Sequence, residues 1–181
     1  MIRKVDRKTK RNRGRSGEVA LELGLMLLPT LAIIFGFLDV GMAIFTWNTL
    51  QNSVREGSRY AITFQTSGSN GQVQSVKNVV SQWAMGFVTA TATSSTTPAA
   101  PYVDVSFYAS GATSTALTGA GANRTGNIVE VAVKNYPYRW MFPFSGTFTS
   151  AFYAPLSSQL TISVYSSDVL GGTPVGGAPA L

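Results

Sequence analysis

The chain has 181 residues, of which 45% are hydrophobic and 12% are charged, so it is large enough for a membrane segment and one modest domain. It contains no Cys and no His, which excludes metal sites built with either residue, Ser-His-Asp triads and Cys nucleophiles. We therefore expect a protein that is not an enzyme and that holds no cofactor.

The net charge of +6 comes from the first residues of the chain. Residues 1–17 carry eight Lys or Arg against one acidic residue, Asp6, whereas residues 18–181 carry six basic and seven acidic side chains. Basic arms can bind nucleic acid, but an apolar segment follows this one, and Lys and Arg beside a membrane span keep their side in the cytoplasm. The sequence predicts a cytoplasmic leader over residues 1–17, a C-terminal domain outside the cytoplasm, and no nucleic-acid partner.

The segment that follows the leader predicts a membrane-spanning helix. Leu23 to Trp47 supplies 25 consecutive residues with Asp39 as their one charge, and a transmembrane helix needs about 20 predominantly apolar residues. Pro29 and Gly36 are compatible with this assignment, because both residue types occur in membrane helices. Asp39 lies near the outer end of the span, where we expect either a solvated carboxylate at the interface or a pair with another subunit.

The same helix is expected to continue beyond the membrane as far as Ile62. One helical stripe is formed by residues at alternating spacings of three and four: Trp47, Leu50, Val54, Gly57 and Ala61. A continuous helix over 18–62 would span roughly 67 Å at about 1.5 Å per residue, about twice the hydrocarbon thickness of a bilayer. Its second half therefore either projects from the membrane or packs on another part of the structure.

Residues 17–61 carry a pattern that is more particular than an apolar helix. The pattern is Gly17-x-Val-Ala-Leu-Glu22, Leu28-Pro29, Phe35-Gly36-x-x-Asp39-x-Gly41 and Leu50-Gln51-Asn52-x-x-Arg55-Glu56-Gly57-x-Arg59-Tyr60-Ala61. It resembles the TadE-like family, the minor pilins or pseudopilins of the tight-adherence (Tad/Flp) type IV pilus system.

The resemblance implies a processing site and an assembly site. An aspartic prepilin peptidase would cleave after Gly17 and leave Glu18 as the new N-terminus, with a free α-amino group. Glu22 would then pair with the N-terminal amine of a neighbouring subunit and set the subunit register.

The resemblance also implies a location and a set of partners. The protein would cross the cytoplasmic (inner) membrane once, with its N-terminus inside. Its partners would be the lipid bilayer, the prepilin peptidase, other pilins or pseudopilins and the Tad assembly proteins, and the assembled pilus would serve cell adhesion.

Two other functions stay open. The main alternative is an uncleaved, single-pass membrane anchor that carries an outward-facing binding domain, with residues 110–126 or 136–148 as its contact surface. The other is a secreted enzyme released by a signal peptidase after Ala43. The apolar region exceeds the roughly 7–15 residues of an ordinary signal sequence, and this cut would fall inside the predicted helix.

The outer domain, residues 63–170, is predicted to have a pilin-like α+β fold. A break at residues 63–71 precedes a helix over 72–87, whose apolar stripe is expected in the core: Val73, Val76, Val80, Trp83 and Phe87. Alternating side chains predict strands at 102–109, 127–136 and 158–167 of an antiparallel sheet packed on the helices. Residues 110–126 are expected to form a loop, and Pro137 to end the second strand.

Three segments are less determined by the sequence. Residues 89–100 fit either a strand or a loop. The aromatic segment 136–148 fits core filling between strands, a position at the membrane interface or a protein-contact patch, and its two prolines argue against regular structure. Residues 171–181 are expected to form a flexible tail.

Overall fold

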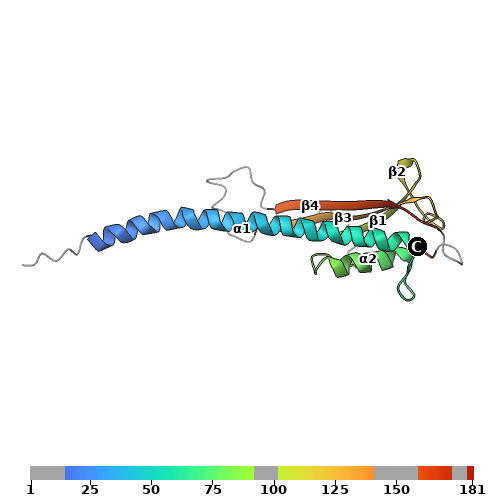
Figure 1. The fold of residues 1–181 in the computed structure, drawn as a ribbon, viewed down its shortest axis with the longest axis horizontal. Helices are drawn as coiled ribbons and strands as arrows, with labels where there is room; N and C mark the ends of the chain where they lie inside the picture. Colours follow the sequence, from blue (N-terminus) through green and yellow to red (C-terminus); the bar gives the residue numbers. More distant parts are fainter. Residues whose placement is uncertain (1–14, 92–101, 141–158, 173–178) are drawn as a thin grey trace, which may run out of the picture. The chain divides into compact units, whose positions relative to one another are not determined.

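The computed structural model describes residues 15–91, 102–140, 159–172 and 179–181. In chain order these residues form α1 (Arg15–Ile62), α2 (Gln72–Trp83), β1 (Tyr102–Ala109), β2 (Ala112–Leu117), β3 (Ile128–Arg139) and β4 (Gln159–Val169) (Figure 1). The predicted α+β class is confirmed. The expectations for the basic leader up to residue 14, and for most of residues 89–100 and 136–148, lie outside the described residues.

The chain divides into two compact units, Met1–Val40 and Gly41–Leu181. The described part of the first unit is the apolar portion of α1, whose side chains are almost all exposed. By length and composition, Gly17–Ile62 is a helix that could cross a membrane. The side chain of Asp39 is buried, which differs from a solvated carboxylate at the interface, one of the two alternatives expected from the sequence.

The second unit contains a four-stranded antiparallel sheet in the order β2-β1-β3-β4. The register aligns apolar residues of neighbouring strands: Val103 with Val133, Val105 with Val131, and Phe107 with Val129. Such directly opposed residues share one face of the sheet. This face supplies the sheet's side of the core, as the alternation in the sequence predicts.

The part of α1 in the second unit buries a stripe that includes Leu50, Val54, Gly57 and Ala61. Trp47 is not part of it, because the stripe continues through Thr46 and Ala43 and leaves Trp47 on the surface. In α2, Val76 and Val80 are buried, but Trp83 is exposed. The predicted core position of Trp83 is therefore wrong, and Trp47 lies outside the buried part of its predicted stripe.

Three elements also differ from the prediction: β2, β3 and α2. Strand β2 forms within residues 110–126, which were expected to be a loop. Its residues before Leu117 are small or β-branched, and the strand lies at the edge of the sheet beside β1. Strand β3 continues through Pro137, which is opposite Thr161 of β4. The described pairing of β3 with β1 ends at Lys134, and a strand paired on one side tolerates Pro.

Helix α2 ends at Trp83, earlier than the expected end at residue 87. The physical reason is the backbone of the next turn, where Met85 and Gly86 have φ values of +52° and +85°. These values belong to the left-handed region, which cannot continue a right-handed helix.

The last described residues, 179–181, lie against the start of α2. The backbone N–H of Gln72 donates to the carbonyl oxygen of Ala180 at 2.7 Å. The side-chain amide of Asn123 donates to the carbonyl oxygen of Pro179 at 2.8 Å and to Oε1 of Gln72 at 2.7 Å. Gln72 and Asn123 are both buried, and these bonds satisfy donors that would otherwise be costly to bury.

Lys134 and Asp104 form an ion pair between neighbouring strands on the face of the sheet opposite the core. The hydrogen bond that the Lys134 ammonium group donates to Asp104 raises the pKa of Lys134 above its ordinary value, and partial burial opposes this shift. Burial raises the pKa of the Tyr136 hydroxyl group. Contacts within the fold explain both pKa shifts, and neither shift indicates a reactive site.

Candidate functional site

The predicted processing residues lie in the first turn of α1. The helix begins at Arg15, so that Gly17 and Glu18 are already helical, and both are exposed. A Cβ at Gly17 would meet no atom within 4 Å. The first N–H groups of a helix have no acceptor within it, and glycine weakens helical structure. The peptide bond after Gly17 is therefore accessible, and little structure must open to extend it.

Glu18 and Glu22 are four residues apart on α1 and therefore share one face of the helix. Both side chains are exposed. The dipole of the helix favours a negative charge in its first turn, where Glu18 lies, but like charges at this spacing repel by roughly 0.2–0.5 kcal/mol. The sequence has no Lys or Arg between Arg15 and Arg55. Within α1, a cation for Glu22 could therefore come only from the helix start.

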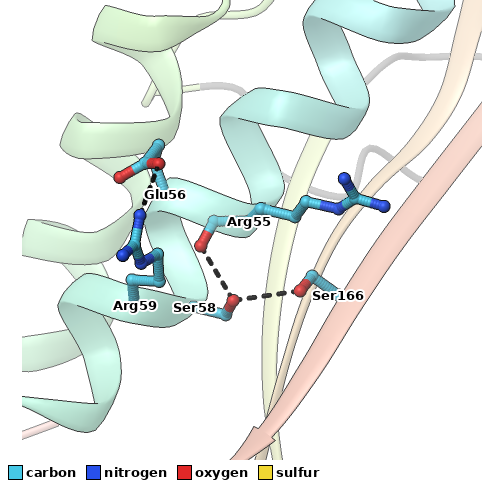
Figure 2. A network of polar contacts seen from close by, with 5 residues as sticks. All are labelled: Arg55, Glu56, Ser58, Arg59 and Ser166. Atoms are coloured by element: carbon cyan, nitrogen blue, oxygen red, sulfur yellow. Dashed lines mark hydrogen bonds and ion pairs between the residues drawn. The ribbon is translucent and has the colours of Figure 1, made fainter.

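The second half of the sequence pattern serves a different purpose, because its residues attach α1 to the sheet. Figure 2 shows the hydroxyl group of Ser58, which donates to the carbonyl oxygen of Arg55 at 2.9 Å and lies 3.0 Å from the hydroxyl oxygen of Ser166 in β4. Nε2 of Gln51 donates to the carbonyl oxygen of Tyr165 at 3.2 Å. The Arg59–Glu56 ion pair, 3.2 Å long, is exposed and lies within one turn of the helix (Figure 2).

Gly57 allows α1 to approach α2 and the sheet at the same point. A Cβ built at this position would lie 2.5 Å from Cγ2 of Val80 in α2 and 3.3 Å from Cγ1 of Val131 in β3. One turn further on, Nε2 of Gln72 donates to the carbonyl oxygen of Ala61 at 2.8 Å. The Gly57–Ala61 part of the pattern is thus explained by close packing of two helices on a sheet.

Sequence reasoning did not identify the buried polar pair of Gln72 and Asn123. Their amide groups connect α1, α2, the loop after β2 and residues 179–181. The two residues are 51 positions apart, and a single sequence contains no signal that would bring them together.

A hollow of about 740 Å³ lies beside this pair. It is lined by residues 119–121, 123–125 and 179–181. Its charged lining residue is Arg124, and the amide nitrogen of Asn123 is already occupied by two acceptors. Within the described residues, no group of three or more acidic side chains is placed to hold a metal ion. These features do not define a catalytic or cofactor site.

A family model described as "TadE-like protein" matches residues 17–59. This range begins at the predicted processing glycine and ends in the helix turn that contacts α2 and β4, and it agrees with the resemblance found in the sequence. No curated protein and no solved structure matches the chain. The match thus covers nearly all of α1 and leaves α2 and the sheet without a counterpart.

The close contact at Gly57 generates a stability prediction. Replacing Gly57 with Ala places a methyl group against Val80 and Val131 in a filled core, and overpacking of this kind costs about 1–3 kcal/mol. Replacing Gly41, whose added Cβ would meet no atom within 4 Å, gains up to about 1 kcal/mol of helix propensity. Thermal unfolding of the detergent-solubilised protein should give a Tm several degrees lower for Gly57→Ala than for Gly41→Ala. Equal Tm values would contradict the packing described here.

Proposed function

We propose that this protein is a TadE-like minor pilin or pseudopilin that takes part in the assembly of a Tad/Flp-type pilus for adherence. The observation that carries the proposal is the match of residues 17–59 to the TadE-like family, on a helix long and apolar enough to cross a membrane, whose residues up to 40 are almost all exposed. The charge distribution supports an orientation with the N-terminus in the cytoplasm, because the basic residues concentrate before the apolar segment.

In this proposal, a prepilin peptidase cleaves after Gly17. The leader carries a net charge of +7, and a basic side chain near an anionic membrane surface contributes about 1 kcal/mol of attraction. Removal of the leader therefore takes away several kcal/mol of attachment to the cytoplasmic membrane face. The remaining chain has a net charge of −1 and could leave the bilayer more readily during assembly.

Cleavage also creates a cation that can pair with Glu22. The new α-amino group belongs to Glu18, at the start of the same helix face. A carboxylate within lipid costs on the order of 2.5–3.5 kcal/mol near the bilayer centre and less near the interface. In the proposed assembly, the amine of one subunit pairs with Glu22 of a neighbour, and the exposed apolar side chains of α1 pack against neighbouring helices.

The processing step can be tested by Gly17→Ala, with Gly24→Ala as the matched control. Neither added Cβ meets a neighbouring atom, so both variants should fold and insert as the wild type does. An extra methyl group in a tight peptidase site costs about 1–3 kcal/mol, which corresponds to roughly 5- to 150-fold in cleavage rate. Intact-mass spectrometry of protein from cells that contain the peptidase should show the leader retained in Gly17→Ala and removed in Gly24→Ala. Wild-type processing of Gly17→Ala would refute cleavage at this bond.

The assembly role of Glu22 can be tested by Glu22→Gln, with Glu22→Asp as the charge-retaining control. Glutamine keeps the size and most of the hydrogen bonding of glutamate but removes its charge, so insertion and cleavage should persist. Loss of the pair with a neighbouring amine could cost a few kcal/mol, and the number of pili should fall sharply in Glu22→Gln while Glu22→Asp retains part of the wild-type level. Normal piliation of Glu22→Gln would exclude the pairing role, and a failure of processing would assign Glu22 to peptidase recognition.

A further inference from the structure

The turn that follows α2 presents apolar side chains to the surface. Trp83 is 52% exposed and Met85 is 72% exposed. The surrounding residues 78–91 contain no charged side chain. We call residues 83–87 the α2 turn. Exposed apolar side chains that lie together without charged residues among them indicate a surface that contacts a protein, a ligand or a membrane.

Ring contacts fix the position of the α2 turn relative to α1. The ring of Phe87 meets the ring of Phe45 in α1 edge to face, with centroids 6.5 Å apart, and that of Tyr136 in β3 at 5.9 Å. At its other end, α2 begins with Gln72 bonded to Ala61. Helix α2 therefore runs back along α1, and the α2 turn lies at the level of Phe45.

The backbone of the α2 turn favours a functional explanation for Met85. This residue directly follows the helix cap Ala84 and has a φ of +52°, a conformation that glycine or asparagine adopts with less strain. A flexible apolar side chain at an exposed, left-handed position adds little to folding. Strain of this kind persists where the residue serves another purpose.

The level of Phe45 corresponds to the outer membrane interface of the proposed span. Counted from Leu23, the roughly 20 residues that cross the hydrocarbon core end near Met42. The headgroup region adds several ångströms, or about four to five residues of helix at 1.5 Å each. This range contains Phe45 and Trp47, which are 47% and 48% exposed. Tryptophan is enriched at this depth because its ring is apolar and its N–H group is polar.

We propose that the α2 turn is a second membrane contact, in which Trp83 and Met85 enter the outer interface of the bilayer beside Phe45 and Trp47. The inference rests on the membrane span in the proposed function and adds a surface that lies outside the residues matched by the TadE-like family. Lipid is the occupant that the structure favours, because the exposed residues of α1 between Gly41 and Trp47 are uncharged and the contact of Phe45 with Phe87 places the α2 turn beside them. The contact holds the outer domain against the membrane until the subunit is extracted.

Fluorescence quenching by brominated lipid tests this contact in the full-length protein. The chain has three tryptophans, Trp47, Trp83 and Trp140. The double variant Trp47→Phe/Trp140→Phe reports on Trp83 alone, and Trp83→Phe/Trp140→Phe reports on Trp47 alone. Each is reconstituted in phosphatidylcholine–phosphatidylglycerol vesicles whose acyl chains are brominated near the carbonyl end, near the methyl end or not at all.

We expect Trp83 and Trp47 to lose fluorescence to a comparable extent in the vesicles brominated near the carbonyl end, and Trp83 to lose less in those brominated near the methyl end. Quenching of Trp47 without quenching of Trp83 would overturn the inference alone and would indicate that a protein surface covers the α2 turn. Absence of quenching at both positions would overturn the membrane span, and with it the proposed anchor.

The role of Met85 is tested in the Trp83-only protein by Met85→Asn and Met85→Leu. Asparagine suits the left-handed backbone but is polar, whereas leucine keeps the apolar side chain. Quenching of Trp83 should fall in Met85→Asn and persist in Met85→Leu. Unchanged quenching in Met85→Asn would overturn the assignment of Met85 to the membrane contact.

Discussion

Burial of one face of α1 between Leu50 and Ala61 is the interaction on which the outer domain depends. The sheet presents its valines to this face, and α2 closes it through Val76 and Val80. Gly57 sets how closely the three parts approach, because a side chain there would displace both Val80 and Val131. Polar contacts from Gln51 and Ser58 to β4 fix the rotation of the helix about its axis.

This packing explains one part of the sequence pattern of residues 17–59 and leaves the other part unexplained. In its second part, Leu50, Gln51 and Gly57 are accounted for by contacts within the domain, whereas Asn52, Arg55 and Arg59 are exposed. Its first part is not explained in this way, because Gly17, Glu18 and Glu22 are exposed, and a Cβ at Gly17 would meet no atom within 4 Å. Pattern residues that no contact within the chain explains are candidates for contacts with other molecules. The proposed contacts with the peptidase and with neighbouring subunits are made by these residues.

Periodicity predicted much of the fold. The alternating valines of β1 and β3 indicated the buried face of the sheet, and the stripe from Leu50 to Ala61 indicated the buried face of α1. Both predictions follow because side chains return to the same face every two residues along a strand and about every 3.6 residues along a helix. Strand β2 and the continuation of β3 through Pro137 could not be predicted, because they depend on neighbouring strands rather than on local preference. The Gln72–Asn123 pair was equally hidden, since only the folded chain brings the two residues together.

Trp83 was assigned to the core because large aromatic residues on an apolar stripe usually pack inside, and Trp47 was placed on the apolar stripe of α1. Both are instead exposed near Phe45 and Phe87. A periodic pattern distinguishes apolar from polar surroundings, but it cannot distinguish a protein core from a lipid interface, since both favour the same side chains. The same limit applies to Glu22, whose pattern fits an interface or a subunit contact equally well.

The central claim is that one helix contributes its first half to a lipid bilayer and its second half to a domain outside the cytoplasm. The absence of cysteine from the chain permits a direct measurement with two single-cysteine variants, Leu28→Cys in the apolar half and Asn52→Cys on the exposed face of the second half. A membrane-impermeant maleimide is added to cells whose outer envelope has been made permeable while the inner membrane stays intact. The account predicts that position 52 is labelled at once and that position 28 is labelled only after the membrane is dissolved in a denaturing detergent. Equal labelling of both positions, or labelling of position 52 only after the cells are lysed, would contradict it.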